Sequence, residues 1–195
     1  MVSNKTTYIC GDSFGVDDPH STISPWHKDL ESVNLCKNCA PNLNISKQVD
    51  LAIRSQASFI IVLFTSIMRQ EWKDTFFTFT AIDNSPAEFN SNQINTLENY
   101  YIDFFEVGNE ILKNKCIIES TLQNLVDSGI PFLFDQGGFE HAKFGATAQY
   151  FTKYNKYRSK YNLWDYGDTV DKTPAFHITD QLIHNRVAEY YREQT

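Results

Sequence analysis

At 195 residues the chain is long enough for one well-buried core and short for two, so we expect a single domain over residues 1–195. Its 42% hydrophobic and 21% charged residues exclude an intrinsically disordered chain. The net charge of −7 argues against broad electrostatic attraction to nucleic acid or to an anionic membrane surface.

The first predicted strand leads directly into the most informative loop of the chain. Residues 6–10 are β-branched and aromatic, which predicts a strand, and a tight loop that contains Ser13 follows it. A short helix is expected near residues 26–30, and residues 32–35 predict a second strand.

A helix and a buried strand come next. Asn44 offers a helix cap, and apolar residues at positions i, i+4, i+7 and i+8 from Ile45 predict one face of a helix. The continuous apolar run at residues 58–65 predicts a central parallel strand covered on both faces. Residues 72–92 are polar and aromatic, and we expect a long loop there.

The C-terminal half continues the alternation. Two helices are expected within residues 93–128, ended by Gly129, and residues 130–135 predict another strand. Further helices are expected over residues 141–161 and 179–193. Strands that alternate with helices predict an α/β fold with three α/β/α layers around a central parallel sheet, in the flavodoxin-like manner.

The sequence has neither a long apolar segment nor a dense set of cysteines, and these two features bear on cellular location and thiol state. The longest apolar run, residues 59–64, has the length of a strand, too short for a signal peptide or a membrane span. We therefore expect a soluble cytoplasmic protein that does not bind membranes. Four cysteines are too few for the disulfide framework of a small secreted domain, so we expect reduced thiols.

Residues 11–15, Gly-Asp-Ser-Phe-Gly, fit two serine motifs that predict different folds. One is the G-x-S-x-G elbow of α/β-hydrolases, which follows several strands and opens a helix directly. Here a single predicted strand precedes Ser13 and an Asp-Asp-Pro segment follows it, so that interpretation fails on context. The other motif is a Gly-Asp-Ser block just past the first strand.

In order and spacing the chain resembles the SGNH (GDSL-type) hydrolases along nearly its whole length. Residues 34–45 are similar to the family's second block, with Cys39 where the family has its oxyanion glycine. His177 precedes the last predicted helix, as the family's base does. The resemblance implies an SGNH-hydrolase-like fold, a catalytic Ser13 and His177 as its base.

Two further blocks depart from the family pattern. The third block, which carries the oxyanion asparagine, is replaced by residues 65–69, Thr-Ser-Ile-Met-Arg. In the last block, Pro174 stands where the aspartate partner of the base is expected. Divergent SGNH-like proteins of tailed phages show a similar pattern, with a Thr-Ser pair and a downstream arginine, and this resemblance implies a phage origin.

A serine hydroxyl is a poor nucleophile until a base accepts its proton, and the base needs a third group to orient it. Ser13 and His177 would supply the first two. Asp171, Asp180 or a backbone carbonyl would orient His177, and we take Asp180 as the candidate. His184, four residues beyond Asp180, is expected to be a helix-surface partner.

The oxyanion of the intermediate also needs donors. The backbone N–H of Ser13 is still present as one donor, and the side chain of Asn42 or Ser66 would add a second. Cys39 occupies the place of the family's oxyanion glycine. Arg69 would bind an anionic substrate group bidentately or form a surface salt bridge. Losing one oxyanion donor costs on the order of 10²–10³ in rate, so we expect a slow enzyme.

A C-x-x-C sequence, Cys36 to Cys39, offers a redox alternative because it stands between a strand and a helix. Pro41 and Asn42 separate it from the helix, which argues against that use. A zinc site would need two further ligands that the sequence does not supply in a recognised spacing.

Basic residues interleave with tyrosines in the segment 150–161, a pattern that would suit RNA or phosphorylated glycans. Because the net charge is −7, we instead expect these basic residues to form a solvated face that covers buried tyrosines. The residues concerned are Lys153, Lys156, Arg158 and Lys160, with Tyr150, Tyr154, Tyr157 and Tyr161.

The leading hypothesis is a serine esterase or carbohydrate deacetylase that acts on a small ester or an acetylated glycan without a cofactor or a metal. The alternative is a catalytically impaired SGNH-like fold that serves as a binding protein or a virion structural protein, and the departed blocks motivate it. Either hypothesis is compatible with a homo-oligomer.

Overall fold

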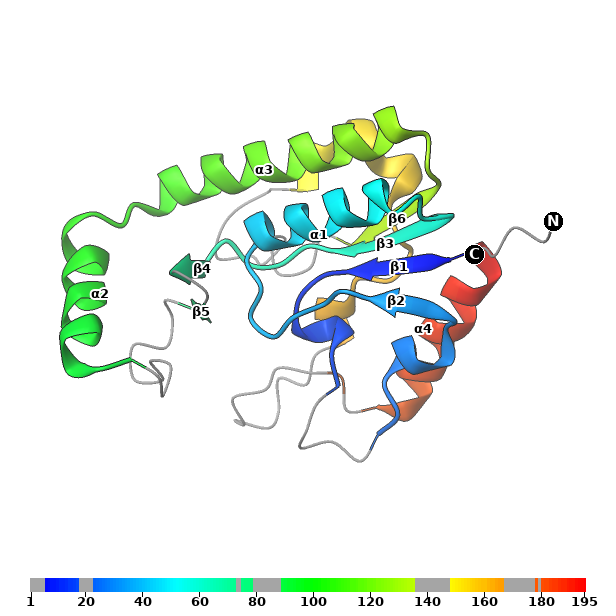
Figure 1. The fold of residues 1–195 in the computed structure, drawn as a ribbon, viewed down its shortest axis with the longest axis horizontal. Helices are drawn as coiled ribbons and strands as arrows, with labels where there is room; N and C mark the ends of the chain where they lie inside the picture. Colours follow the sequence, from blue (N-terminus) through cyan, green and yellow to red (C-terminus); the bar gives the residue numbers. More distant parts are fainter. Residues whose placement is uncertain are drawn as a thin grey trace.

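A four-stranded parallel sheet forms the middle layer of the protein, whose computed structural model describes residues 6–17, 23–72, 75–78, 89–135, 148–166, 178 and 180–195. The strand order is β2-β1-β3-β6, and every pairing is parallel (Figure 1). This order matches the first four strands of the flavodoxin-like arrangement. The strands are β1 (Thr7–Cys10), β2 (Ser32–Asn34), β3 (Phe59–Leu63) and β6 (Phe132–Asp135).

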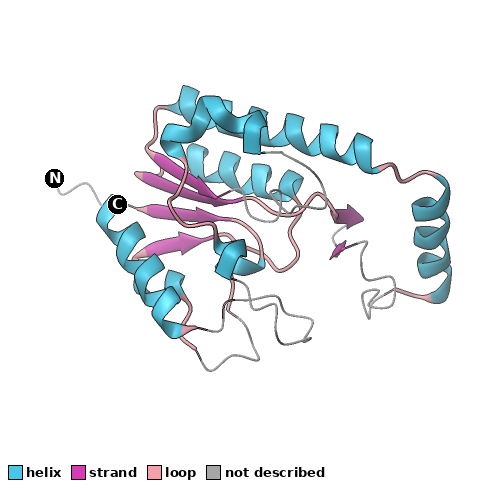
Figure 2. Ribbon diagram, turned by 180° about the vertical axis from the view of Figure 1, so that it is seen from behind, coloured by secondary structure: helices cyan, strands magenta, loops and turns pink. Residues whose placement is uncertain are grey.

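Helices cover both faces of this sheet. Helices α1 (Asn42–Arg54) and α3 (Val107–Ser128) pack on one face, and α4 (Gln181–Gln194) packs on the other with the short 3₁₀ helix Trp26–Asp29 (Figures 1 and 2). The predicted three-layer α/β/α fold with a central parallel sheet is therefore confirmed. None of the helices that the structure describes is both long and apolar enough to cross a membrane.

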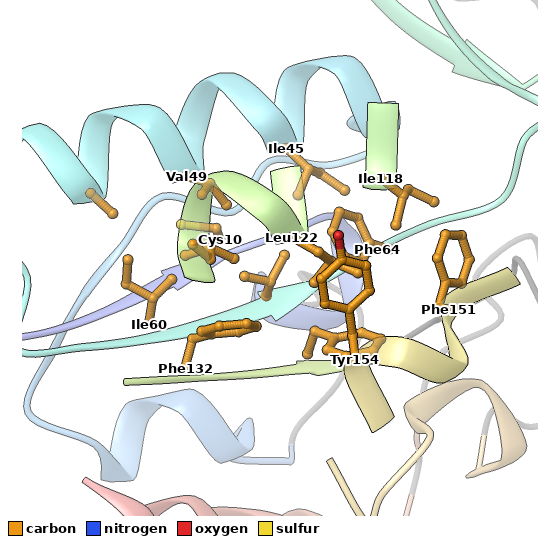
Figure 3. Close-up of a cluster of buried hydrophobic side chains, with 14 of the residues drawn as sticks. Cys10, Ile45, Val49, Ile60, Phe64, Ile118, Leu122, Phe132, Phe151 and Tyr154 are labelled. Atoms are coloured by element: carbon orange, nitrogen blue, oxygen red, sulfur yellow. The ribbon is translucent and has the colours of Figure 1, made fainter. Parts of the chain in front are cut away.

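Strand β3 supplies the core on both sides of the sheet, because all five of its residues are buried. Ile60 and Val62 point to the α1 and α3 layer, where Figure 3 shows Ile60 in one cluster with Ile45 and Val49 of α1. Phe59, Ile61 and Leu63 point to the α4 layer. This is the two-faced burial that the continuous apolar run predicts.

Two local predictions are wrong. The loop expected from residue 72 instead begins with a hairpin, in which β4 (Arg69–Trp72) pairs antiparallel with β5 (Thr75–Thr78). Its cross-strand pairs stabilise it through contacts that no single-strand pattern displays. Asn44 does not cap α1, because the helix already begins at Asn42 and the Asn44 side chain accepts a hydrogen bond from Gln48 within it.

The two predicted helices of the middle segment are present, with α2 spanning Ser91–Asp103 ahead of α3. Asn90 and Gln93 form a reciprocal capping box at the start of α2. Gly129 ends α3 with a φ of +70°, the left-handed conformation that glycine adopts without a steric penalty. Helix α2 stands away from the sheet (Figures 1 and 2), and none of its residues is fully buried.

The helix predicted over residues 141–161 is shorter and tighter than expected. Within the described part of that segment, a kinked 3₁₀ stretch spans Ala148–Tyr157, and residues 141–147 lie outside the described residues. Tyr154 is buried, while the Lys153 ammonium lies 4.7 Å from the centre of its ring. Lys156 covers Tyr157 in the same way at 4.6 Å. This is the solvated basic face over inward-facing tyrosines that the net charge favours.

Trp26 joins the N-terminal serine loop to the C-terminal helix. Its indole Nε1–H donates to the Phe14 carbonyl at 3.0 Å, and its backbone N–H donates to His184 Nδ1 at 3.1 Å. Its ring packs on Tyr191 of α4 at a centroid distance of 5.1 Å. Because Trp26 is only 1% exposed, these contacts fix the loop after β1 against α4.

We predict that Trp26→Phe lowers the free energy of unfolding by about 1–3 kcal/mol, because it removes the indole donor of a buried hydrogen bond and opens a void. Urea unfolding followed by circular dichroism measures this loss. Trp72→Phe, at a half-buried position, is the matched control, for which we expect a loss below about 1 kcal/mol. A Trp26→Phe loss no larger than that of the control would contradict the prediction.

Candidate functional site

The residues after β1 and after β3 meet at the carboxyl edge of the sheet. Cys10 is aligned with Val62, so the two strands end side by side and Asp12 and Ser13 lie close to Thr65. Open α/β sheets bind their ligands at this edge. The candidate site is therefore the loop after β1 together with the segment after β3.

Gly11 allows the close approach of these two segments. A Cβ atom at this position would lie 2.7 Å from Leu63 Cβ, closer than two side chains can come. The side chain of Gln48 holds the Gly11 peptide from the other side, accepting from its N–H at 2.7 Å and donating to its carbonyl at 3.2 Å. The position of Ser13 is thus fixed by the backbone just before it.

Asp12 is a buried carboxylate that organises the serine loop. One carboxylate oxygen accepts from the Phe14 N–H at 3.1 Å and caps the short 3₁₀ helix Ser13–Gly15. The other accepts from the Thr65 hydroxyl at 2.6 Å. Sequence reasoning did not single out this bond to Thr65, because it joins the segments that follow two different strands.

Arg69 brings a positive charge to Ser13. Its Nη2 donates to Ser13 Oγ at 3.3 Å and lies 3.6 Å from Asp12 Oδ2. The Arg69 side chain is 12% exposed and that of Asp12 is 1% exposed. The alternative of a surface salt bridge for Arg69 is therefore wrong, since its carboxylate partner is buried behind the serine.

Asn42 already uses its amide within the protein. Its Nδ2 donates to the Thr65 carbonyl at 2.9 Å and to Asn114 Oδ1 at 2.8 Å, and its Oδ1 accepts from the Thr65 N–H at 2.9 Å. An amide has two protons, so none remains for a substrate in this arrangement. Asn42 ties α1 to the end of β3, next to the candidate site.

Ser66 lies beside Thr65 and is 9% exposed. Its Oγ accepts from the Met68 N–H at 3.2 Å and its carbonyl accepts from the Arg69 N–H at 3.2 Å, so it shapes the turn that leads into β4. The hydroxyl proton of Ser66 is not needed for either bond. Ser66 thus keeps a donor near the end of β3.

Cys39 has the backbone conformation of a glycine. Its φ is +56°, in the left-handed region that side chains disfavour. Within the described part of the chain, no hydrogen bond uses the backbone N–H of Cys39 or that of Ser13. Two N–H donors thus remain available in the segments where the SGNH pattern has its oxyanion residues.

The pKa of the Cys36 thiol argues against a redox function for the C-x-x-C sequence. Burial raises this pKa well above its ordinary value, and the Cys10 thiol and the Asp12 carboxylate nearby raise it further. A thioredoxin-like site needs the opposite shift, because the thiolate is the reactive form. A Cβ on Gly15 would collide with the Cys36 sulfur, so the Cys36 side chain packs directly against the serine loop.

Of the candidate base and its two candidate carboxylate partners, only Asp180 lies within the described residues. His177 and Asp171 lie outside the described residues. Ile178 is buried in the same apolar cluster as Phe14, the residue that follows Ser13. Asp180 is exposed and caps α4, accepting from the Leu182 N–H at 2.8 Å. Its second carboxylate oxygen is not used in this bond.

His184 is a buried structural residue, so its predicted place on the helix surface is wrong. It is 8% exposed, with Nδ1 accepting from the Trp26 N–H at 3.1 Å and Nε2 3.0 Å from the Ile178 carbonyl. One ring nitrogen accepts and the other faces an acceptor, so the neutral imidazole satisfies both contacts. The prediction that His184 is not the base agrees with this engagement.

His27 is a second buried histidine beside the serine loop, and sequence reasoning did not identify it. It is 8% exposed, and its Nε2 lies 3.3 Å from Asp17 Oδ1. Burial lowers the pKa of His27 below its ordinary value, and the Asp17 carboxylate only partly opposes this shift. Folding therefore favours the neutral form of the imidazole.

No family model matches this sequence, and no curated protein matches it. Among solved structures, the chain is similar to the psychrotrophic esterase EstA from Pseudoalteromonas sp., described as inhibited by monoethylphosphonate. The TM-score is 0.56 at 9% identity, over 98% of this chain and 96% of that one. An acetyl xylan esterase, AlAXEase, aligns with a TM-score of 0.46 at 10% identity, over 96% of this chain and 98% of that one.

At 9% identity the likeness to EstA shows the fold alone, and the looser superposition on AlAXEase adds no argument. The parallel sheet between two helical layers and this likeness agree with the SGNH-hydrolase-like fold expected from the sequence. The chain thus shares its α/β fold with EstA. Neither solved structure bears on a phage origin, which stays a prediction.

We predict that His27 makes the protein less stable as the pH falls through 6.5. The unfolded chain binds a proton to this residue near its ordinary pKa of about 6.5, whereas the folded chain binds it only at lower pH. The stabilisation that comes from keeping His27 neutral in the folded chain is therefore complete above pH 6.5 and is lost below it. Melting temperatures of wild type and His27→Gln between pH 8 and pH 5 should converge with decreasing pH, and parallel curves would contradict this.

Proposed function

We propose that this protein is a serine hydrolase, an esterase or a carbohydrate deacetylase, that acts through an acyl intermediate on Ser13. The observation that carries the proposal is the Ser13 hydroxyl just after the carboxyl end of β1, 3.3 Å from the largely buried guanidinium of Arg69. The esterase-like fold around it supports the same conclusion. Serine and a positive charge at this edge suit chemistry that develops an oxyanion.

In the proposed reaction, His177 accepts the Ser13 hydroxyl proton while Oγ attacks the carbonyl carbon of the ester. The Oγ–carbon bond forms and the carbonyl π electrons move to its oxygen. Collapse of this tetrahedral adduct breaks the bond to the leaving alcohol, which takes the proton from His177. Water then attacks the acyl-serine with the same help and releases the acid.

The packing of the chain around Ile178 supports His177 as the base. The residue after His177 shares an apolar cluster with Phe14, the residue after Ser13. Trp26 reinforces this link, since it binds the Phe14 carbonyl and the His184 ring of α4 at once. Ile178 and the serine loop thus contribute to the same buried cluster, and this is the basis on which we propose His177 as the base.

The oxyanion would take its backbone donors from Ser13 and Cys39. Both N–H groups lack an acceptor within the described part of the chain, and Cys39 has the left-handed φ of the glycine that it replaces. The Ser66 hydroxyl is a further candidate. Asn42 is the weaker one, because both of its amide protons are already donated to the protein.

The proposed substrate is a small ester or an acetylated glycan. EstA is described as an esterase, and that name agrees with an acyl group as the part that is transferred. An acyl-serine mechanism with a histidine base needs no cofactor. The described residues contain no group of three or more metal-binding side chains in a suitable arrangement.

A second candidate function is that of a binding or virion structural protein with an SGNH-like fold. The observation that favours it is the apolar surface at the junction of α2 and α3, where Ile102 is 76% exposed and Phe104 is 74% exposed. Exposed apolar side chains that adjoin in this way are typical of interaction sites. The two functions are separated by the following test of catalysis.

We predict that a fluorophosphonate probe labels Ser13 in the wild-type protein and that p-nitrophenyl acetate is hydrolysed. Ser13→Ala should abolish the labelling, because it removes the nucleophile, and His177→Ala should lower the rate by at least about 10³ because it removes the base. Mass spectrometry and absorbance at 405 nm measure the two effects. Wild type that neither labels nor turns over above Ser13→Ala would refute the hydrolase and favour the binding protein.

We predict that Asp180 orients His177, so that Asp180→Asn lowers kcat by about 10² or more. Asparagine is as good a helix cap as aspartate, so the melting temperature should stay nearly unchanged. This separates the loss of charge from the loss of the cap. Asp171→Asn is the matched comparison, and a loss of kcat in that variant with none in Asp180→Asn would assign the role to Asp171.

A further inference from the structure

One nitrogen of the Arg69 guanidinium makes no hydrogen bond to any of the described residues. Nη2 contacts Ser13 and Asp12, but Nη1 is buried and has no hydrogen-bond partner among the residues that the structure describes. Leaving a buried donor of a charged group unpaired destabilises the fold. A group of this kind needs an explanation, and a ligand atom is one.

The partner of this guanidinium can be located from Ser13. When Ser13 Oγ forms a tetrahedral adduct, the oxyanion is bonded to the same carbon as Oγ, only two bonds away from it. A donor within hydrogen-bond reach of Oγ is then within reach of the oxyanion after a small movement. Arg69 Nη2, at 3.3 Å from Oγ, meets this condition.

We infer that Arg69 is a catalytic residue whose guanidinium donates to the oxyanion of the tetrahedral intermediate on Ser13. It thereby supplies a full positive charge where the SGNH pattern has a neutral asparagine amide. The inference rests on the proposed hydrolase function and deepens it. It explains how this sequence dispenses with that asparagine, since the Asn42 amide already donates both of its protons to the protein.

Asp12 acts on this chemistry as a positioning residue. Its carboxylate is anchored by the Thr65 hydroxyl and the Phe14 N–H, and it faces Arg69 Nη2 at 3.6 Å. This distance is longer than that of a close ion pair, so the guanidinium keeps hydrogen-bonding capacity for another anion. In a buried site a fixed charge stabilises a developing anion more strongly than it would in water.

The competing role for Arg69 is to bind an anionic group of the substrate in the ground state. The contact with Ser13 Oγ argues against it, because an atom that accepts from Nη2 lies next to the scissile carbonyl. A carboxylate or phosphate group remote from the ester would need a cation further from the serine. The two roles differ in kinetics, because an oxyanion exists only after the attack.

The test compares Arg69→Gln and Arg69→Lys with wild type in the hydrolysis of p-nitrophenyl acetate, a neutral ester. Arg69→Gln should lower kcat by about 10²–10³ while KM changes less than about threefold, because it removes an interaction of the transition state. Arg69→Lys should regain part of kcat, since it keeps the charge. Arg186→Ala, at an exposed position on α4, is the control and should match wild type.

Chemical rescue tests the same inference where a variant is poorly folded. In Arg69→Ala, added guanidinium chloride at non-denaturing concentration should raise kcat at least about tenfold, whereas sodium chloride at equal ionic strength should not. Melting temperatures in both salts verify that the rescue is not a gain of folded protein. The rate of fluorophosphonate labelling of Ser13 should fall in parallel with kcat, since the adduct also bears an oxygen at the oxyanion position.

Each outcome has one meaning. An active wild type with kcat unchanged in folded Arg69→Gln would overturn the inference and leave the hydrolase intact. A rise in KM at constant kcat would also overturn it and would assign Arg69 to ground-state binding. A wild type without Ser13-dependent turnover would refute the proposed hydrolase and the inference together.

Discussion

The parallel register of β1 with β3 is the constraint on which the candidate site depends. Because Cys10 is aligned with Val62, β1 and β3 end at the same level of the sheet. The Asp12 carboxylate then accepts from the Thr65 hydroxyl at 2.6 Å. A slip of one residue would turn every side chain of β1 to the other face and separate these groups. The positions of Ser13 and of its contact with Arg69 follow from this register.

Sequence patterns predict the elements whose signal is local. The apolar run of β3, the helical face that begins at Ile45 and the stop at Gly129 are read from neighbouring residues, and the structure confirms them. The hairpin of β4 with β5 escaped prediction because cross-strand pairing stabilises it. The prediction that Asn44 caps the helix was wrong because the sequence does not distinguish an asparagine that caps a helix from one that bonds to Gln48 inside it.

The candidate site divides in the same way. Ser13 and the glycine-like Cys39 are recognised from motifs that are continuous in sequence, and Cys39 has the φ that the motif requires. The contacts that organise the site join distant residues: Thr65 to Asp12 over 53 positions and Asn42 to Thr65 over 23. No spacing rule covers such pairs. The burial of Arg69 was missed because arginine is usually exposed and only tertiary packing reveals the exception.

The pair formed by Asp12 and Arg69 is difficult to explain by stability alone. A buried ion pair stabilises well only when its geometry is close and its remaining donors are satisfied, whereas this pair is 3.6 Å apart and leaves Nη1 without an acceptor in the described residues. A bidentate fork on the carboxylate would have satisfied the guanidinium. Instead Thr65 and the Phe14 N–H hold the carboxylate, and the guanidinium is turned toward Ser13. This arrangement becomes favourable once negative charge develops next to the serine, which is the point at which a hydrolase needs it.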